Sequence, residues 1–213
     1  MLLTLPSTRA LTLRISNLPQ MRSLWAMPGY PAVIQRWNTF SRTHYLIPLA
    51  QNGSAAPSCG DGFNVGLVWA GRESHLLEAQ RSLDLVQLKP LTEVAGCRFF
   101  ALHEDDRSEE LAAAGMADTV TDLSGQLSDF GDTARVIAGL DLVIGVDTAV
   151  VHLAGALNVP VWTMLAKIGD WRWMLERDDT PWYPAMRLFR QTERGDWSPV
   201  IAEIVRELTI RHG

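Results

Sequence analysis

Short apolar runs alternate with amphipathic stretches along the chain from residue 64 onward. The apolar runs predict six strands: Asn64–Trp69, Arg98–His103, Asp118–Asp122, Leu142–Val146, Val161–Leu165 and Met186–Arg190. Helical periodicity predicts five helices: Leu83–Val94, Ser108–Ala114, Phe130–Leu140, Thr148–Leu157 and Pro199–Thr209. This alternation is typical of βαβ units, and strands that are apolar throughout are typical of a parallel sheet with helices on both faces. The pattern therefore predicts an α/β fold with a Rossmann-like, doubly wound parallel sheet.

The first 60 residues show no such periodicity. The segment Ala50–Gly62 is rich in Gly, Ser, Pro and Asn, which is the composition of a linker. We therefore expect two parts in the chain. Residues 1–60 form an irregular appendage or the remnant of an amino-terminal domain, and residues 61–213 form the Rossmann-like domain.

Composition narrows the class of protein. Of the 213 residues, 47% are apolar and 20% are charged, which is enough for one core. The net charge of −5 argues against a general nucleic-acid surface. No apolar stretch reaches the roughly 18 to 20 residues that span a bilayer, and the opening segment does not fit a secretory signal. Cys59 and Cys97 lie in unlike contexts that indicate neither a disulfide framework nor a metal knuckle. We expect a cytoplasmic protein with no transmembrane segment.

The apolar run at 142–146 ends at two polar residues, Asp147 and Thr148. In an open parallel sheet, ligands bind beyond the carboxyl ends of the strands, where the next helices begin. Thr148 can cap the predicted helix with its hydroxyl, and the dipole and free amides of the first turn make a seat for an anion such as a diphosphate. These amides belong to Ala149, Val150 and Val151.

His152 lies four residues after Thr148 and therefore on the same helix face. Its imidazole can point a ring nitrogen at a ligand on that seat. The sequence equally permits a purely structural interpretation, in which Asp147 or Thr148 is only a helix cap and His152 is a core histidine that hydrogen-bonds a carbonyl.

Two further loops follow predicted strands on this edge. The loop at 70–83 is either a solvated surface loop or a phosphate-binding one, and it carries residues that can approach a phosphate: Gly71, Arg72, His75 and Arg81. The loop at 166–184 is long and rich in Trp and charge, and loops of this length are often functional. Its aromatic residues can stack on rings and sugars, or can pin the loop to the body of the domain: Trp171, Trp173, Trp182 and Tyr183.

Several common catalytic motifs are absent from the sequence. It contains no G-x-G-x-x-G after the first strand, no G-x-x-x-x-G-K-[ST], no H-E-x-x-H and no G-x-S-x-G. A dinucleotide oxidoreductase, a P-loop hydrolase and an α/β-hydrolase are therefore disfavoured.

Three stretches carry a family resemblance: VGLVWAG with RSL, DLVIGVDTAVVHLAGALNVPVW, and DWRWMLERDDTPWYPAMRLFRQ followed by DWSPVI. In this order they resemble the carboxyl-terminal half of bacterial heptosyltransferase-like glycosyltransferases. The similarity is greatest to the forms found at the end of tetratricopeptide-repeat proteins, which are distantly akin to O-GlcNAc transferases. The resemblance implies a GT-B architecture, in which two Rossmann-like domains face a cleft and the carboxyl-terminal one holds the nucleotide-sugar donor.

The resemblance also implies roles for individual residues. The family's Asp-Thr-Gly-x-x-His signature falls on Asp147, Thr148, Ala149 and His152, with alanine in place of the usual glycine. In such enzymes the threonine and the following amides, here including that of Val150, hold the diphosphate, while the acid faces the sugar. Arg81 falls where the family has a Lys or Arg that neutralises the diphosphate. Asp147 and His152 are the candidates for catalytic residues.

The implied activity is transfer of a hexosyl or heptosyl group from a nucleotide-diphosphate sugar to a protein or glycan acceptor. No cofactor is implied besides this donor, and no Asp-x-Asp motif or His/Cys cluster predicts a metal site. In this architecture the acceptor and the general base belong to an amino-terminal Rossmann domain, which 60 residues cannot build. We therefore expect either an incomplete enzyme or a partner chain that completes the cleft. The alternative is a non-catalytic module that binds a nucleotide or a nucleotide sugar.

Overall fold

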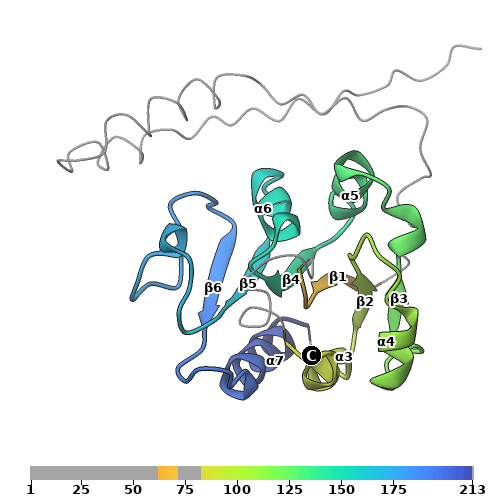
Figure 1. Cartoon of the computed structure of the whole chain (residues 1–213), viewed down its shortest axis with the longest axis horizontal. Coiled ribbons are helices and arrows are strands. Elements are labelled where there is room, and N and C mark those ends of the chain that lie inside the picture. Colours follow the sequence, from red (N-terminus) through yellow and green to blue (C-terminus); the bar gives the residue numbers. More distant parts are fainter. Residues whose placement is uncertain (1–61, 72–82, 213) are drawn as a thin grey trace, which may run out of the picture. The chain divides into compact units, whose positions relative to one another are not determined.

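The computed structural model describes residues 62–71 and 83–212 (Figure 1). The predicted appendage at 1–60 lies outside these ranges, as do Arg72, His75 and Arg81 of the loop after the first strand.

Within the described residues, six strands form a single parallel sheet in the order β3-β2-β1-β4-β5-β6. The chain builds one half of the sheet outward from β1 and then returns to build the other half from β4, which is the doubly wound topology. The predicted fold class is therefore confirmed, including the parallel pairing of segments 142–146 and 161–165. The strands are β1 (Phe63–Val68), β2 (Cys97–Ala101), β3 (Val120–Asp122), β4 (Leu142–Val146), β5 (Val161–Leu165) and β6 (Met186–Arg190).

The predicted helices are present, with one correction. The segment predicted as one helix at 83–94 is divided into a 3-10 helix, η2 (Leu85–Leu88), and a short α-helix, α3 (Lys89–Thr92). Pro90 causes this division, because proline fits only the first turn of an α-helix. The other predicted helices are α4 (Ser108–Ala113), α5 (Phe130–Ile137), α6 (Ala149–Ala156) and α7 (Ser198–His212). Two 3-10 helices that were not predicted are η3 (Ser124–Gln126) and η4 (Trp171–Trp173).

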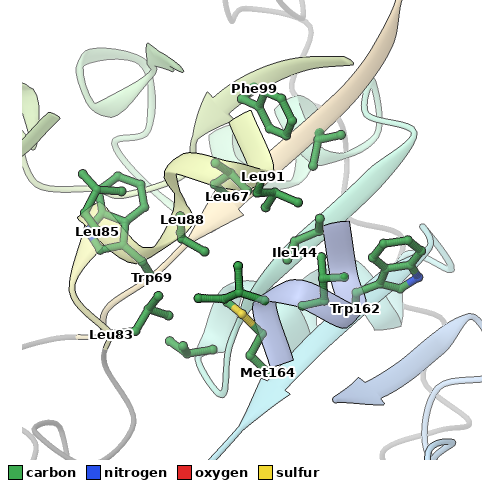
Figure 2. Packing of buried hydrophobic residues seen from close by; sticks show 14 of the residues in the cluster. Leu67, Trp69, Leu83, Leu85, Leu88, Leu91, Phe99, Ile144, Trp162 and Met164 are labelled. Atoms are coloured by element: carbon green, nitrogen blue, oxygen red, sulfur yellow. The ribbon is translucent and has the colours of Figure 1, made fainter. Parts of the chain in front are cut away.

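Helices cover both faces of the sheet (Figure 1). Helices α5 and α6 pack on one face, and α3, α4 and α7 pack on the other. Figure 2 shows the second of these interfaces, where Leu88 and Leu91 meet strand residues such as Leu67 and Ile144. Strands that are buried on both faces explain why the sequence shows continuous apolar runs. None of the helices in the described ranges has the length and hydropathy that crossing a bilayer requires.

Candidate functional site

The carboxyl end of β4 carries the predicted site. Asp147 follows the strand directly and is buried, with 6% of its surface exposed. Thr148 occupies the N-cap position of α6, with an extended backbone (φ −136°, ψ 168°). Strand β4 lies beside β1 and β5, so the start of α6 is near the middle of the sheet edge, beside the point where the strand order reverses. This is where doubly wound folds bind their ligands.

The hydroxyl of Thr148 does not cap the helix, contrary to the role that the sequence suggested. Thr148 has the backbone conformation of an N-cap, but its side chain accepts no hydrogen bond from the first turn. Its Oγ1 is instead buried and has no hydrogen-bond partner. An unpaired buried hydroxyl costs free energy, typically about 1 to 3 kcal/mol in proteins. The hydroxyl is therefore a polar group that a ligand at the helix start would satisfy.

The amides at the start of α6 are also available to an anion. No described residue accepts a hydrogen bond from the amides of Ala149, Val150 or Val151. Ala149 is exposed, whereas Val151 is fully buried and anchors the helix. The helix dipole adds partial positive charge at this end. The arrangement therefore suits a phosphate or diphosphate.

His152 is surrounded by three groups. Its Nε2 lies 3.5 Å from Oδ1 of Asp147, and its Nδ1 lies 3.1 Å from the hydroxyl oxygen of Tyr183. Its ring stacks on that of Trp173, with centroids 5.0 Å apart and planes inclined by 20°. The imidazole remains partly exposed. Asp147, Thr148 and His152 thus lie together at one edge, as their spacing predicts, while their roles toward a ligand remain predictions.

The loop at 166–184 brings Trp173 and Tyr183 to this place. Trp173 is fully buried, and Nε1 of Trp182 donates to the carbonyl of Arg172 at 2.8 Å. Arg190 of β6 donates to the carbonyls of Trp173 and Arg177. The predicted pinning role of the aromatic residues is therefore confirmed for Trp173, while Trp171 and Trp182 are exposed and the bond of Trp182 lies within the loop itself.

The contact of this loop with His152 was not predicted from the sequence. The usable signal is the order of the strands, because the loop after β5 must pass close to the end of β4 when these strands are neighbours.

A pocket of about 440 Å³ lies at the same edge of the sheet, on the side of α7. It is lined by residues that follow β5 and β6 and by the start of η2, including Lys167, Gln191, Arg194 and Gln87. The predicted residues at the start of α6 do not line it. This pocket is therefore separate from the candidate diphosphate seat.

Arg81 is the remaining predicted site residue, and it lies outside the described residues. Its role remains a prediction. In the described part of the chain, no three or more His, Cys, Asp or Glu side chains are grouped so that they hold a metal ion.

The comparisons with known proteins agree with this architecture. Residues 93–194 match the model of Glycosyltransferase family 9 (heptosyltransferase), and this range contains Asp147, Thr148 and His152. The described structure is similar to the E. coli ADP-heptose LPS heptosyltransferase II, with 14% identity, a TM-score of 0.50, and coverage of 71% of this chain and 48% of that chain. At this identity the similarity shows the α/β fold alone.

The chain is also similar to two other proteins. The chain is 30% identical over 153 residues to Protein FlbA of Caulobacter vibrioides, covering 70% of this chain and 25% of the relative. It is also similar to the E. coli heptosyltransferase WaaC with ADP, with 18% identity, a TM-score of 0.49, and coverage of 76% and 47% of the two chains. The chain therefore spans about a quarter of the length of Protein FlbA and about half of each E. coli enzyme.

Proposed function

We propose that this chain is the donor-binding half of a glycosyltransferase that uses a nucleotide-diphosphate sugar. One observation carries the proposal: the start of α6 presents a buried, unpaired Thr148 hydroxyl beside uncapped amides, inside the segment that matches the heptosyltransferase family. We also propose that the protein is cytoplasmic and that it is related to the glycosyltransferases found at the end of tetratricopeptide-repeat proteins.

The proposed chemistry assigns a role to each group. The amides of the first turn and the Thr148 hydroxyl bind the diphosphate, and Asp147 faces the donor sugar. The bond between the anomeric carbon and the diphosphate oxygen breaks as an acceptor oxygen bonds to that carbon. Arg81 and the helix dipole stabilise the negative charge that the departing nucleoside diphosphate gains, so no metal ion is required for this step. The acceptor oxygen loses its proton to a base on a facing domain or partner chain.

The proposal is tested by measuring donor binding and turnover side by side. Thermal shift with a panel of nucleotide sugars and their nucleoside diphosphates identifies the base and the sugar. Calorimetry then gives affinities, and product analysis detects transfer or hydrolysis of the donor. Binding with turnover supports the glycosyltransferase, while binding without turnover supports the non-catalytic module. Failure of every nucleotide to bind contradicts both.

The Thr148→Val variant separates a ligand-binding role of the hydroxyl from a structural one. Valine has nearly the same shape, and the lost hydroxyl has no partner in the protein, so the free energy of unfolding should stay the same or rise slightly. Affinity for the nucleoside diphosphate should fall by about 1.5 to 3 kcal/mol, the scale of a hydrogen bond to a charged group. Chemical denaturation and calorimetry measure the two quantities.

Thr133→Val is the matched control for this experiment. The Thr133 hydroxyl of α5 donates to the carbonyl of Asp129, the N-cap residue of that helix, at 2.9 Å. This control should lose about 1 kcal/mol of stability and keep its affinity, the reverse of the Thr148 variant. Equal affinities for wild type and Thr148→Val would remove the hydroxyl from the site.

The Arg81→Ala variant tests the role that the family resemblance assigns to this cation. If Arg81 contacts the diphosphate, its loss should weaken binding of the nucleoside diphosphate by about 1.5 to 3 kcal/mol. Arg206→Ala removes the same charge from an exposed position on α7 and should leave affinity unchanged. Calorimetry at two salt concentrations compares them, and equal affinities for both variants would place Arg81 outside the site.

A further inference from the structure

The contacts of His152 determine where its proton lies. An ionised carboxylate only accepts hydrogen bonds, so Nε2, which faces Oδ1 of Asp147 at 3.5 Å, must carry a hydrogen to interact favourably. In the neutral ring, Nδ1 then has no hydrogen and can only accept. The Tyr183 hydroxyl, 3.1 Å from Nδ1, is therefore the donor in this pair.

We infer that Tyr183 is a positioning residue, whose hydroxyl donates to Nδ1 of His152 and fixes the ring in the orientation that directs Nε2 at Asp147. The inference extends the proposed function, because its importance for sugar transfer rests on Asp147 facing the donor. The orientation of the ring itself rests only on the contacts within the protein.

The fold provides a specific place for the Tyr183 ring. Gly155 of α6 lies directly beneath it, and a Cβ atom at that position would lie 2.6 Å from Cγ of Tyr183. Any other residue at 155 would therefore displace the ring. Trp173 stacks on His152 and limits its rotation. Burial raises the pKa of the Tyr183 hydroxyl above its ordinary value, so the group remains a donor at neutral and moderately alkaline pH.

The loop at 166–184 positions His152. This loop supplies both the group that orients His152, Tyr183, and the ring that stacks on it, Trp173. The loop thereby controls how His152 faces the Asp147 carboxylate at the end of β4. A loop that packs in this way sets the orientation of His152.

Nitrogen NMR of the protein labelled with ¹⁵N-histidine tests the inference without any ligand. The spectra are recorded at a pH where the imidazoles are neutral, and His152→Gln identifies the His152 signals. In wild type, Nδ1 of His152 should give the signal of an unprotonated nitrogen and Nε2 that of a protonated one. In Tyr183→Phe, the Nδ1 signal should move, because its hydrogen-bond donor is gone.

His103 is an internal control in the same spectra. Its Nε2 faces the main-chain N–H of Trp69 at 3.4 Å, so it should show the opposite tautomer, and its signals should not change in Tyr183→Phe if the fold is intact. Gly155→Ala is a second variant, which keeps the hydroxyl but displaces the ring, and it should change the His152 signals in the same way. A protonated Nδ1 in wild type, or His152 signals that stay at their wild-type positions in Tyr183→Phe, would overturn the inference.

Calorimetry on the same variants separates this inference from the proposed function. The expected tautomer together with absent nucleotide binding supports the positioning contact and contradicts the donor site. Nucleotide binding with unchanged His152 signals in Tyr183→Phe supports the donor site and contradicts the role of Tyr183. If donor turnover is measurable, Tyr183→Phe should lower kcat severalfold while KM changes little, because the hydroxyl contacts His152 rather than the diphosphate seat.

Discussion

Replacing Trp173 by alanine is expected to lower the free energy of unfolding by about 3 to 5 kcal/mol, the usual cost of removing a large buried aromatic side chain. Trp173 has no exposed surface, and it packs between the core and the ring of His152. The variant should also lose order in the loop that Arg190 fixes through the carbonyl of residue 173. Chemical denaturation measures the first effect, and limited proteolysis within 166–184 measures the second.

Trp173→Phe is the matched control. It keeps an aromatic ring against His152 and removes the indole N–H, which is buried and has no hydrogen-bond partner. The cost should therefore be clearly smaller than that of Trp173→Ala, because the lost packing is partly offset by removal of an unpaired polar group. Equal losses in both variants would show that the packing of the ring against His152 contributes little, and a stable Trp173→Ala protein would contradict the anchoring role.

The sequence predicts the sheet well where apolar runs are short and have polar boundaries. The bounds of β4, β5 and β6 agree with the prediction, and β4 and β5 begin and end with apolar residues. Strand β3 is shorter than predicted, since the chain around Asp118 and Thr119 forms a turn in which Thr119 bonds back to Met116. Local turn hydrogen bonds of this kind compete with strand pairing and leave little trace in periodicity.

The candidate site is predictable only in part. Spacing places Asp147, Thr148 and His152 on one edge, because a strand end and a helix start fix their positions along the chain. The direction of the Thr148 hydroxyl depends on the surrounding packing, which the sequence does not show, so its expected cap was wrong. The contact between His152 and Tyr183 spans 31 positions and requires the strand order as well as the path of an irregular loop. Neither follows from a periodic pattern.

A second buried imidazole should make stability depend on pH. His103 lies two residues beyond β2, is 5% exposed, and packs against the indole of Trp69 with ring centroids 4.1 Å apart. Burial, and next the charge of Arg107, lower the pKa of His103 from 6.5 to about 4. The carboxylates of Asp105 and Asp122 oppose this shift only partly. The folded protein therefore keeps His103 neutral at pH values where the unfolded chain binds a proton.

Because the pKa of His103 is lower in the folded protein than in the unfolded chain, the folded protein should be less stable at low pH. Between pH 6.5 and about 4 the unfolded state holds more protons at His103 than the folded state, so stability decreases as the pH falls. The whole contribution, about 3 kcal/mol for a shift of this size, is present above pH 6.5 and is lost below pH 4. Chemical denaturation at a series of pH values measures the slope.

His103→Gln isolates this contribution from the other acidic and basic groups. Glutamine does not titrate, and its side-chain oxygen can still accept the N–H of Trp69. The variant should therefore lose less stability than wild type between pH 7 and pH 4, and the difference between the two curves should approach about 3 kcal/mol across that window. Parallel curves for the two proteins would mean that His103 takes up its proton in the folded state as readily as in the unfolded one. In that case water reaches the imidazole, and the contact with Trp69 does not keep it neutral.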